Sequence, residues 1–479
     1  MFTKKKQISK PKLFLGNTPL PFVNNIKILG LIFDKLTWKP HIIKTKTSAT
    51  KSINILKTLS HVEWGAKSSV LINLYRSLVR SKLDYGSICY TNSYPNLQKT
   101  IDIIHNNGLR VATGALRSSP IPRILSISRE PPLHIRRTKL ALNYISRILS
   151  SPENSTLPFV TQNRFANIFC SNSNLKKPLG LRMLYEMSLN NIDPNSIIKR
   201  EYSVVPHWRV PSFLVDTNLA NYSKKETSSI IYKNLFNEII NSPPSNPQIY
   251  TDASKTNSGV AIAIINGHQS ISYKLPDHNS IYTAEYFALL EGVYLAIQLP
   301  DSITNICTDL LSALNNLKYN WYSSTLAIKI SNIIVKANKY IRFIWTPGHC
   351  RIDGNEKADQ VAREAVNNPL TEIRTYSSLI DIHRNVSTFC TNVWESEWRR
   401  TPNKKLREIK NTTEYWPKPH TSNRKDEVVI NRLRIGHSKM SHEHLMRRKD
   451  PAMCQTCGEP LTVKHLLVQC RNHIDTRKR

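Results

Sequence analysis

The sequence has little or nothing of several features that define common protein classes. Glycine makes up only 14 of the 479 residues, which argues against a collagen-like or low-complexity protein. No apolar stretch approaches the roughly 18 residues that a membrane span requires. The first six residues carry three lysines and no apolar run, so they do not indicate a signal peptide. We therefore expect an intracellular protein without a membrane partner, and the sequence does not distinguish nucleus from cytoplasm.

Cysteine is also sparse, and its positions do not suggest disulfides. Five of the eight cysteines are scattered along the chain. The other three lie close together near the end, at Cys454, Cys457 and Cys470, with His465 between them. Clustered thiols with a neighbouring histidine in an intracellular protein indicate a metal site before a disulfide.

Acidic residues are in short supply. The chain has 67 Lys and Arg against 34 Asp and Glu, a formal charge of +33. Such a surplus indicates a polyanionic partner, most often RNA or DNA. The alternative is an ordinary solvated surface. Between residues 245 and 368, ten basic residues balance ten acidic ones, so any charge-driven grip on nucleic acid is expected outside that segment. The oligomeric state cannot be inferred.

The length is enough for roughly two to four domains. Residues 1–150 are expected to form a mainly helical unit behind short strands at 12–15 and 26–33. Residues 151–243 show little periodicity and are interpreted as a connection, which ends in a linker rich in Ser and Pro at 242–247. A domain of different pattern follows at 244–368. Residues 369–479 are expected to be a basic helical tail that ends in the Cys–His cluster at 454–470.

The segment 244–368 alternates strand and helix patterns, which predicts an α/β fold. Strands are predicted at 248–252, 258–265, 270–274, 305–308 and 340–345. Helices are predicted at 281–298, 310–317, 326–339 and 355–366. The order βββαβααβα predicts a mixed five-stranded sheet with flanking helices.

Four acidic residues in this segment are candidate metal ligands. Asp252 and Asp309 end strand-like runs, whereas Glu285 and Asp359 lie on predicted helices. Carboxylates in such places can converge, and oxygen-only ligands suit Mg²⁺ or Mn²⁺. Two such ions about 4 Å apart can clamp the attacking water and the leaving oxygen of a phosphodiester. Each acid taken alone has a plainer explanation, since Asp309 precedes a helix and could cap it.

The residues around these acids resemble four motifs of the type-1 RNase H family. The motifs read YTDAS at 250–254, TAE at 283–285, CTDLLSAL at 307–314, and WTPGHC at 345–350 with GNEKAD at 354–359. Leu310 stands where the family more often has Ser. The resemblance covers residues 244–368. It implies an RNase H-like fold and metal-dependent cleavage of the RNA strand in RNA–DNA hybrids.

The resemblance also implies a role for each site residue. Asp252 would bridge two Mg²⁺ or Mn²⁺ ions. Glu285 and Asp309 would hold the ion that supports the leaving group, and Asp359 the ion that activates water. His349 would assist proton movement or product release, work that suits a side chain with a pKa near roughly 6.5. The alternative for His349 is an ordinary surface-loop histidine.

The N-terminal third resembles the end of the palm and the thumb of non-LTR retrotransposon reverse transcriptases, most closely those of the jockey kind. The segments that carry this resemblance are KILGLIFD at 27–34, LTWKPH at 36–41, LYRSLVRSKLDYG at 74–86, NGLRVATGA at 107–115 and EPPL at 130–133. These polymerases hold their metals with paired aspartates, and the chain contains no Asp-Asp dipeptide. We therefore expect no polymerase activity. The chain would then be either a truncated element copy or the product of a recruited host gene.

The C-terminal cysteines follow the pattern C-x2-C-x7-H-x4-C, with ligands Cys454, Cys457, His465 and Cys470. Three thiolates and one imidazole suit tetrahedral Zn²⁺. A short helix at 463–469 would present the histidine. The pattern resembles the C-terminal zinc module of jockey-type polyproteins. The alternative is three free thiols and an incidental histidine.

Two functions thus remain for the whole chain. The first is a ribonuclease acting on RNA–DNA hybrids. The second is a catalytically inactive, nucleic-acid-binding remnant of a retrotransposon, for which the positive charge alone would suffice.

Overall fold

The computed structural model describes residues 12–34, 37–162, 166–172, 175–206, 208–209, 213–241, 246–267, 269–301, 303–401, 406, 409–414, 416, 423–447 and 450–477. The first four residues of the expected linker, 242–245, lie outside these described residues. The chain forms two compact units, one made of residues 1–141 and 388–479 and the other of residues 142–387. Within the described part of the chain, none of the helices combines the length and the apolar character needed to cross a membrane.

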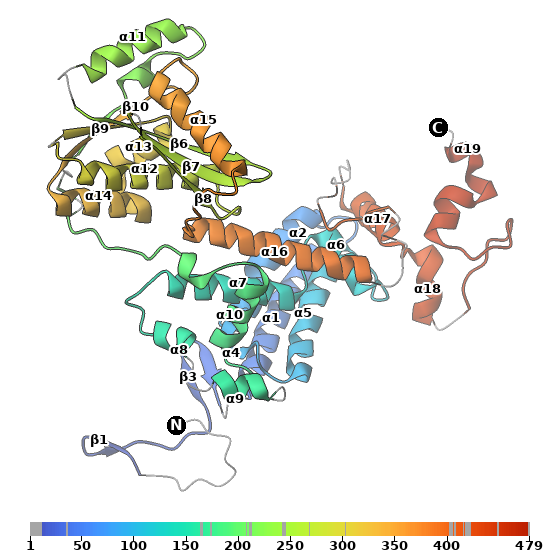
Figure 1. The fold of residues 1–479 in the computed structure, drawn as a ribbon. Coiled ribbons are helices and arrows are strands. Elements are labelled where there is room, and N and C mark those ends of the chain that lie inside the picture. Colours follow the sequence, from blue (N-terminus) through green and yellow to red (C-terminus); the bar gives the residue numbers. More distant parts are fainter. Residues whose placement is uncertain are drawn as a thin grey trace. The chain divides into compact units, whose positions relative to one another are not determined.

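The unit of residues 142–387 is built on one six-stranded sheet (Figure 1). The strand order is β5-β10-β9-β6-β7-β8. Strands β6, β7 and β8 form an antiparallel meander, whereas β6, β9, β10 and β5 pair in parallel. The strands are β5 (Phe213–Asp216), β6 (Gln248–Thr256), β7 (Gly259–Asn266), β8 (Gln269–Leu275), β9 (Ile303–Thr308) and β10 (Tyr340–Trp345).

The prediction of five strands was wrong by one, because β5 was missed. This strand has only four residues, too few to show a periodic pattern, and it lies in a stretch interpreted as connection. Its inward residues Phe213 and Val215 are buried, and Phe213 pairs with Ile341 of β10. The edge of β10, which is distant in sequence, supplies the hydrogen-bonding partner that makes this short segment a strand.

Helices cover both faces of the sheet. They are α11 (Ser229–Ile240), α12 (Ile281–Gln298), α13 (Leu311–Tyr319), α14 (Thr325–Ala337) and α15 (Asp353–Asn367). Alternate residues of β7 point to opposite faces. Ile262 and Ile264 join the main core with α12, whereas Ala261 packs against Ala365 of α15. The small side chain of Ala261 leaves room for α15 on the second face.

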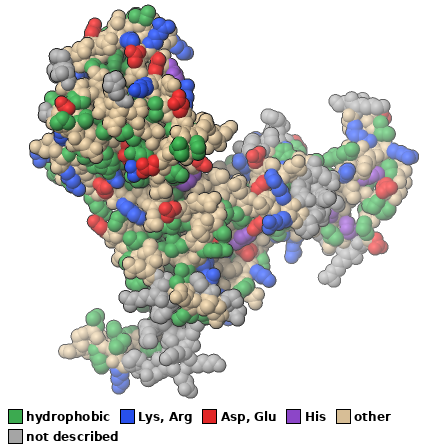
Figure 2. Space-filling model, in the orientation of Figure 1, with side chains coloured by type: hydrophobic (Ala, Val, Ile, Leu, Met, Phe, Trp, Pro, Cys, Tyr) green, Lys and Arg blue, Asp and Glu red, His purple; other side chains and the backbone are tan. Residues whose placement is uncertain are grey.

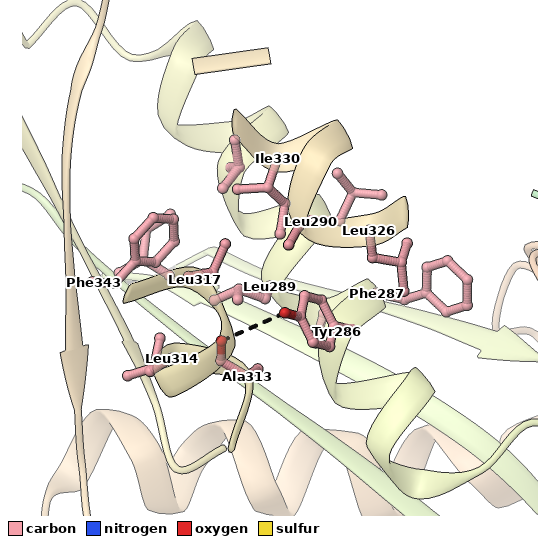
Figure 3. Close-up of a cluster of buried hydrophobic side chains, with 14 of the residues drawn as sticks. Tyr286, Phe287, Leu289, Leu290, Ala313, Leu314, Leu317, Leu326, Ile330 and Phe343 are labelled. Carbon is pink, nitrogen blue, oxygen red and sulfur yellow. Dashed lines mark hydrogen bonds between the residues drawn. The ribbon is translucent and has the colours of Figure 1, made fainter. Parts of the chain in front are cut away.

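The main core lies between the sheet and helices α12, α13 and α14 (Figure 3). The side chains drawn there include Phe287 and Leu290 of α12, Leu317 of α13, Ile330 of α14 and Phe343 of β10. Fully burying side chains of this size contributes roughly 1.5–3 kcal/mol each. This core fixes α12 on the sheet, and α12 carries one of the predicted catalytic acids.

The same unit contains further short elements where the sequence predicted only a connection. They are α8 (Leu157–Thr161), α9 (Ala166–Ser171), α10 (Leu179–Leu189), η2 (Pro194–Ser196) and η3 (Asn218–Asn221). All but α10 have six residues or fewer, too few for a clear periodic signal. A further short turn, η4 (Trp321–Ser323), lies between α13 and α14. Two longer helices, α7 (Leu133–Leu149) and α16 (Leu379–Arg400), contain the boundaries between the two units.

The other unit is mainly helical, as predicted for its N-terminal part. Its helices are α1 (Lys39–Leu59), α2 (Ser68–Tyr75) with the π-helical turn η1 (Arg76–Arg80), α3 (Ser81–Asp84), α4 (Ser87–Tyr90), α5 (Pro95–Thr113), α6 (Ile121–Ser128), α17 (Arg424–Ile435), α18 (Lys439–Arg447), η5 (His465–Gln469), η6 (Arg471–His473) and α19 (Ile474–Arg477). Ile435 of α17 is buried in one core with Ile42 of α1 and Ile101 of α5. The Arg123 guanidinium donates to the Ile435 carbonyl at 2.7 Å. The tail and the N-terminal helices therefore share a core, which the sequence did not indicate.

The single strand expected at residues 26–33 is in fact a hairpin of β3 (Ile26–Ile28) and β4 (Leu31–Phe33). Leu29 and Gly30 between them both have positive φ, 46° and 84°. A two-residue turn with positive φ at both positions reverses an antiparallel pair. A second small hairpin, β1 (Phe14–Leu15) with β2 (Thr18–Pro19), lies where residues 12–15 were expected to be strand.

Candidate metal centres

The sheet register places two of the predicted acids side by side. Thr251 of β6 pairs with Thr308 of β9 in parallel. Asp252 and Asp309 each follow directly after one of these paired residues. Asp252 is only 5% exposed, and Asp309 is partly buried. The parallel pairing of β6 and β9, which joins distant segments, thus brings two carboxylates close together on neighbouring central strands of the sheet.

The third acid comes from α12, which packs closely on β6. Gly292 lies at the contact, where an added Cβ would stand 2.8 Å from the Thr251 methyl carbon. Such a distance is shorter than real side chains tolerate, so a side chain at this position would push the helix away. Glu285, two turns earlier on the same helix, is 6% exposed. Close packing of α12 on β6 therefore places Glu285 next to the two aspartates.

Asp252, Glu285 and Asp309 form one cluster, with an oxygen of each within 4.8 Å of those of the other two. One oxygen of Asp252 accepts the Ala253 backbone N–H at 2.7 Å. Oε2 of Glu285 is buried and has no hydrogen-bond partner among the described residues. A buried carboxylate oxygen without a donor is costly, and a bound cation would satisfy it.

The electrostatics of the cluster agree with that reading. Burial, and then the charge of Asp309, raise the pKa of Asp252 to about 7. Burial, and then Asp252, raise the pKa of Glu285 well above its usual value. Burial also raises the pKa of Asp309, with Asp359 as the next cause. Neighbouring negative charges thus add to burial in disfavouring ionisation of all three side chains, a situation that a divalent cation would reverse.

Asp359 is placed differently from the expected fourth ligand. Among the described residues, it is not part of the group whose oxygens lie within 4.8 Å of one another. Its carboxylate instead pairs with Arg363, one helical turn later on α15, at 2.7 Å. It still acts electrostatically on Asp309 and Asp252. The structure thus brings three of the four acids together, whereas the fourth, Asp359, forms a salt bridge with an arginine.

His349 lies in the loop between β10 and α15, beside the cluster. Its Nδ1 is 3.7 Å from Asp359, and its side chain is 70% exposed. The loop is fastened near both ends, because the Thr346 hydroxyl donates to the buried Asn355 side chain at 2.9 Å. At Gly348 an added Cβ would lie 2.8 Å from a carboxylate oxygen of Asp309. The loop backbone therefore passes directly over one acid and presents His349 to solvent next to it.

One known protein family matches the segment that carries the carboxylate cluster. Residues 244–367 match the family model described as RNase H. This segment is an RNase H domain. A solved structure to which the chain is similar is that of LC11-RNase H1, isolated from compost by a metagenomic approach. It is 17% identical, the similarity covers 26% of this chain and 99% of that one, and the TM-score is 0.23. No curated protein matches the chain.

Sequence reasoning missed several residues that shape the RNase H domain's site. Gly348 and the Thr346–Asn355 hydrogen bond lie within a recognised motif, but their packing roles depend on where Asp309 comes to lie. Lys224 gave no signal, because it precedes the matched segment. Burial raises the pKa of Asp309, and the positive charge of Lys224 offsets a small part of that rise.

The second centre, outside the RNase H domain, contains all four of the predicted zinc ligands. Ligand atoms of Cys454, Cys457, His465 and Cys470 lie within 4.8 Å of one another. The sulfurs of Cys454 and Cys470 are 3.7 Å apart. Two thiolates at tetrahedral positions around zinc, each about 2.3 Å from the ion, would stand about 3.8 Å apart. The spacing is therefore that of a zinc tetrahedron and far longer than a disulfide bond.

The surroundings of these ligands also suit a metal ion. The His465 side chain, followed by the backbone N–H groups of Cys457 and Thr456, lowers the pKa of Cys454 to about 6. Nε2 of His465 is buried and has no hydrogen-bond partner among the described residues. The predicted helix at 463–469 is present over these bounds, with residues 463 and 464 leading into the π-helical segment η5 (His465–Gln469). The donor set fits Zn²⁺.

Proposed function

We propose that the RNase H domain cleaves the RNA strand of RNA–DNA hybrids in a reaction that depends on divalent cations. The observation that carries this proposal is the cluster of Asp252, Glu285 and Asp309. Three carboxylates that are held within 4.8 Å with raised pKa values serve no structural purpose unless a cation neutralises them. The segment that carries these acids matches the RNase H family model, which supports phosphodiester cleavage as the reaction for that cation.

The donor set is all oxygen, which favours Mg²⁺ or Mn²⁺. When bound, two such ions would neutralise the phosphodiester and activate water for attack on it. The chain itself supplies fixed anionic ligands on a rigid sheet and helix. Asp359 would complete the set as a fourth ligand by leaving Arg363, and His349 beside it is placed to move a proton at the edge of the site.

The grip on substrate is proposed to lie largely outside the RNase H domain. The segment 245–368 has as many acidic as basic residues, so the whole surplus of +33 lies elsewhere. Figure 2 shows Asp and Glu interspersed with Lys and Arg over the visible surface of the unit that contains this domain. Basic residues of the other segments would bind backbone phosphates, while contacts to 2′-hydroxyls would select the RNA strand.

We further propose that the Cys–His cluster binds one Zn²⁺, on the strength of the 3.7 Å sulfur separation and the low pKa of Cys454. A retrotransposon origin is supported by the segments 27–34 and 74–86, which resemble the palm and thumb of a reverse transcriptase. The absence of an Asp-Asp dipeptide argues against polymerase activity. The charge surplus keeps one alternative in place, a remnant that binds nucleic acid without cleaving it.

The experiment that decides between the two is a cleavage assay on the full chain. Equal concentrations of an end-labelled RNA–DNA hybrid, the RNA alone and the corresponding duplex DNA are incubated with Mg²⁺ or with EDTA. We expect cleavage only of the RNA in the hybrid, and only with Mg²⁺. Binding of all three nucleic acids without any cleavage would support the non-catalytic alternative and refute the proposal.

A further inference from the structure

The mainly helical unit contains a cavity that belongs to neither of the two candidate metal centres. It has a volume of about 340 Å³ and is lined by α2, η1, the C-terminal ends of α5 and α6, α17 and the side chain of Trp416. Helices α6 and α17, which are far apart in the chain, contact each other there (Figure 1). Sites for small ligands have volumes of about 300–1,000 Å³. The cavity is therefore large enough for one small ligand or one unit of a polymer.

One wall of the cavity is a buried polar network that joins the N-terminal helices to the tail. The hydroxyl of Ser68, the first residue of α2, accepts hydrogen bonds from the Arg424 guanidinium at 2.6 Å and the Asn431 amide at 3.2 Å. The Ser68 backbone N–H donates to the Glu427 carboxylate at 2.7 Å. The Asn431 amide also donates to the Thr113 carbonyl at 3.1 Å. All five residues are buried, and such a network fixes the positions of its members.

The cavity carries an excess of positive charge. Among the described residues that line it, the charged ones are three arginines and one glutamate, namely Arg76, Arg129, Arg434 and Glu427. The Glu427 carboxylate pairs with the buried Arg424 at 3.3 Å. Arg76 pairs with Glu130, which also binds Arg80. Both acids are thus offset by an arginine that does not line the cavity, so the lining as a whole favours an anionic ligand.

An aromatic side chain lies among these cations. Trp416 is partly buried, and the Arg434 guanidinium lies over its ring at 4.4 Å from the ring centroid. This cation–π contact helps to hold the ring in place. Ile72 and Ile127 add apolar surface to the same cavity. A flat aromatic ring can stack on a nucleobase, and guanidinium groups bind phosphate, so the lining matches both parts of a nucleotide.

We propose that this cavity binds one nucleotide of a single-stranded nucleic acid, with the base stacked against the Trp416–Arg434 pair and the phosphate held by the lining arginines. A single strand can place a base in a cavity, whereas a duplex keeps its bases paired and stacked. Stacking tolerates any sequence, because every base has a flat face. The inference goes beyond the proposed function, because the cavity lies in a different unit from the carboxylate cluster and its occupancy requires no cleavage.

The alternative is that Trp416 and Arg434 only pack against each other and contact no nucleic acid. The two roles differ in what removal of each side chain changes. A stacked base contributes to the affinity for single strands but not to its salt dependence, because the indole carries no charge. An arginine bound to a phosphate contributes to both. Loss of a purely structural pair would change the affinities for single strands and for duplexes equally, or leave both unchanged.

The test compares Trp416→Ala, Trp416→Phe and Arg434→Ala with the control Trp64→Ala in the full chain. Trp64 lies in the same unit, is 67% exposed and does not line the cavity. Fluorescence anisotropy gives the Kd for a labelled single-stranded DNA and for the blunt duplex of the same sequence, at several salt concentrations and without a chelator that would remove zinc.

We expect Trp416→Ala to raise the Kd for the single strand by about 5- to 50-fold, with the same slope of log Kd against log[salt] as the wild type. Its Kd for the duplex should change by less than about twofold. Trp416→Phe should restore most of the affinity. Arg434→Ala should raise the single-strand Kd and lower the slope by about 0.7, and Trp64→Ala should resemble the wild type. An unchanged single-strand Kd in Trp416→Ala, or equal losses for single strand and duplex, would overturn the proposal.

Competition with adenosine monophosphate distinguishes a strand from a free nucleotide. A strand makes further phosphate contacts beside the cavity, so we expect the free nucleotide to displace it only at concentrations at least about 100-fold above the Kd of the strand. Displacement at concentrations near that Kd would show that the cavity is a site for free nucleotides, and the assignment to a strand would fail.

The outcome of this test is separate from that of the proposed function, because single-stranded DNA is not a substrate of the proposed cleavage. If the wild type does not cleave the hybrid, the proposed function fails, but a loss of single-strand affinity confined to the Trp416 and Arg434 variants would still support the nucleotide site. If the wild type cleaves the hybrid and these variants bind the single strand as the wild type does, the nucleotide site is refuted and the nuclease assignment stands.

Discussion

The carboxylate cluster and the Cys–His cluster gather their ligand atoms within the same 4.8 Å, yet their electrostatics differ. In the first, burial and neighbouring negative charges raise the pKa of all three acids. In the second, hydrogen bonding lowers the pKa of Cys454 to about 6, while burial raises the pKa of Cys470. The carboxylates therefore resist ionisation without a cation, whereas at least one thiol is ready to ionise before the metal arrives.

The two clusters also differ in how well the segments that hold them are packed. Asp252 and Glu285 are held by β6 and α12, whose packing buries an extensive apolar core. Around the Cys–His cluster the apolar side chains of Met453, Leu467 and Val468 are all more than half exposed. A protein segment without an apolar core depends on its metal to fold. We infer that the carboxylate cluster lowers the stability of the fold that holds it, whereas a zinc ion bound by the Cys–His cluster would stabilise its own module.

The largest expected effect is on the Cys–His module when zinc is removed. Structural zinc contributes roughly 10–16 kcal/mol to small metal-dependent folds. We expect one zinc per chain by elemental analysis, and loss of amide protection in residues 450–477 after chelation or in Cys457→Ser. The exposed Cys89 provides a matched control, and Cys89→Ser should keep its zinc. Full zinc content in Cys457→Ser would show that the Cys–His cluster does not hold the zinc ion through this residue. The contrast between the two clusters would then fail.

The next largest effect is on catalysis through Glu285. Removing one carboxylate ligand should cost several kcal/mol of transition-state stabilisation. Glu285→Gln is therefore expected to slow hybrid cleavage by at least about 100-fold. Glu291, on the same helix, interacts with Arg374 and Lys329 instead, and Glu291→Gln should cleave at nearly the wild-type rate. Comparable losses in both variants would indicate general damage to α12.

The third effect is a pH dependence of stability that belongs to the carboxylates. A carboxyl group whose folded pKa is raised contributes stability below its unfolded pKa and loses it as pH rises through the folded value. For Asp252 the window runs from its ordinary value of 3.8 to about 7. Without divalent ions, we expect the unfolding free energy of the RNase H domain to fall by about 1–3 kcal/mol across that window.

Magnesium should reverse this loss, because it binds the ionised carboxylates. Thermal unfolding with and without Mg²⁺ at pH 5 and pH 8 provides the measurement. We expect Mg²⁺ to raise the Tm at pH 8 and to have little effect at pH 5. Equal stabilisation at both values would show that the ion binds elsewhere.

The smallest expected effect concerns His349, which is exposed and only 3.7 Å from Asp359. A group that assists proton transfer contributes at most about 100-fold here, at the low end of general acid–base catalysis. His349→Ala should lower kcat by about 10- to 100-fold with unchanged Tm. A kcat equal to the wild type would leave His349 as an ordinary loop residue.

Local patterns predicted much of the RNase H domain. The bounds predicted for α12 and β10 are those in the structure, because both are long apolar segments with clear ends. The three clustered acids and the four Cys–His ligands were also identified, since each set has a characteristic order and spacing.

What could not be predicted depends on contacts between distant segments. Strand β5 exists because β10 offers a free edge, and no local pattern of four residues shows that. Asp359 was expected in the cluster, but its pairing with Arg363 at 2.7 Å reflects a competition between two partners. Lys224 and the shared core of α17 with the N-terminal helices likewise involve residues far apart in the chain.

The central claim is that the carboxylate cluster reduces the stability of the fold in order to hold cations for cleavage. The variant Asp252→Asn tests both halves of that claim in one protein sample, measured at pH 8 for hybrid cleavage with Mg²⁺ and for Tm without it. We predict that cleavage is lost by at least about 100-fold while Tm rises, because one repelling charge has been removed. Retained cleavage, or a Tm below that of the wild type, would contradict the account.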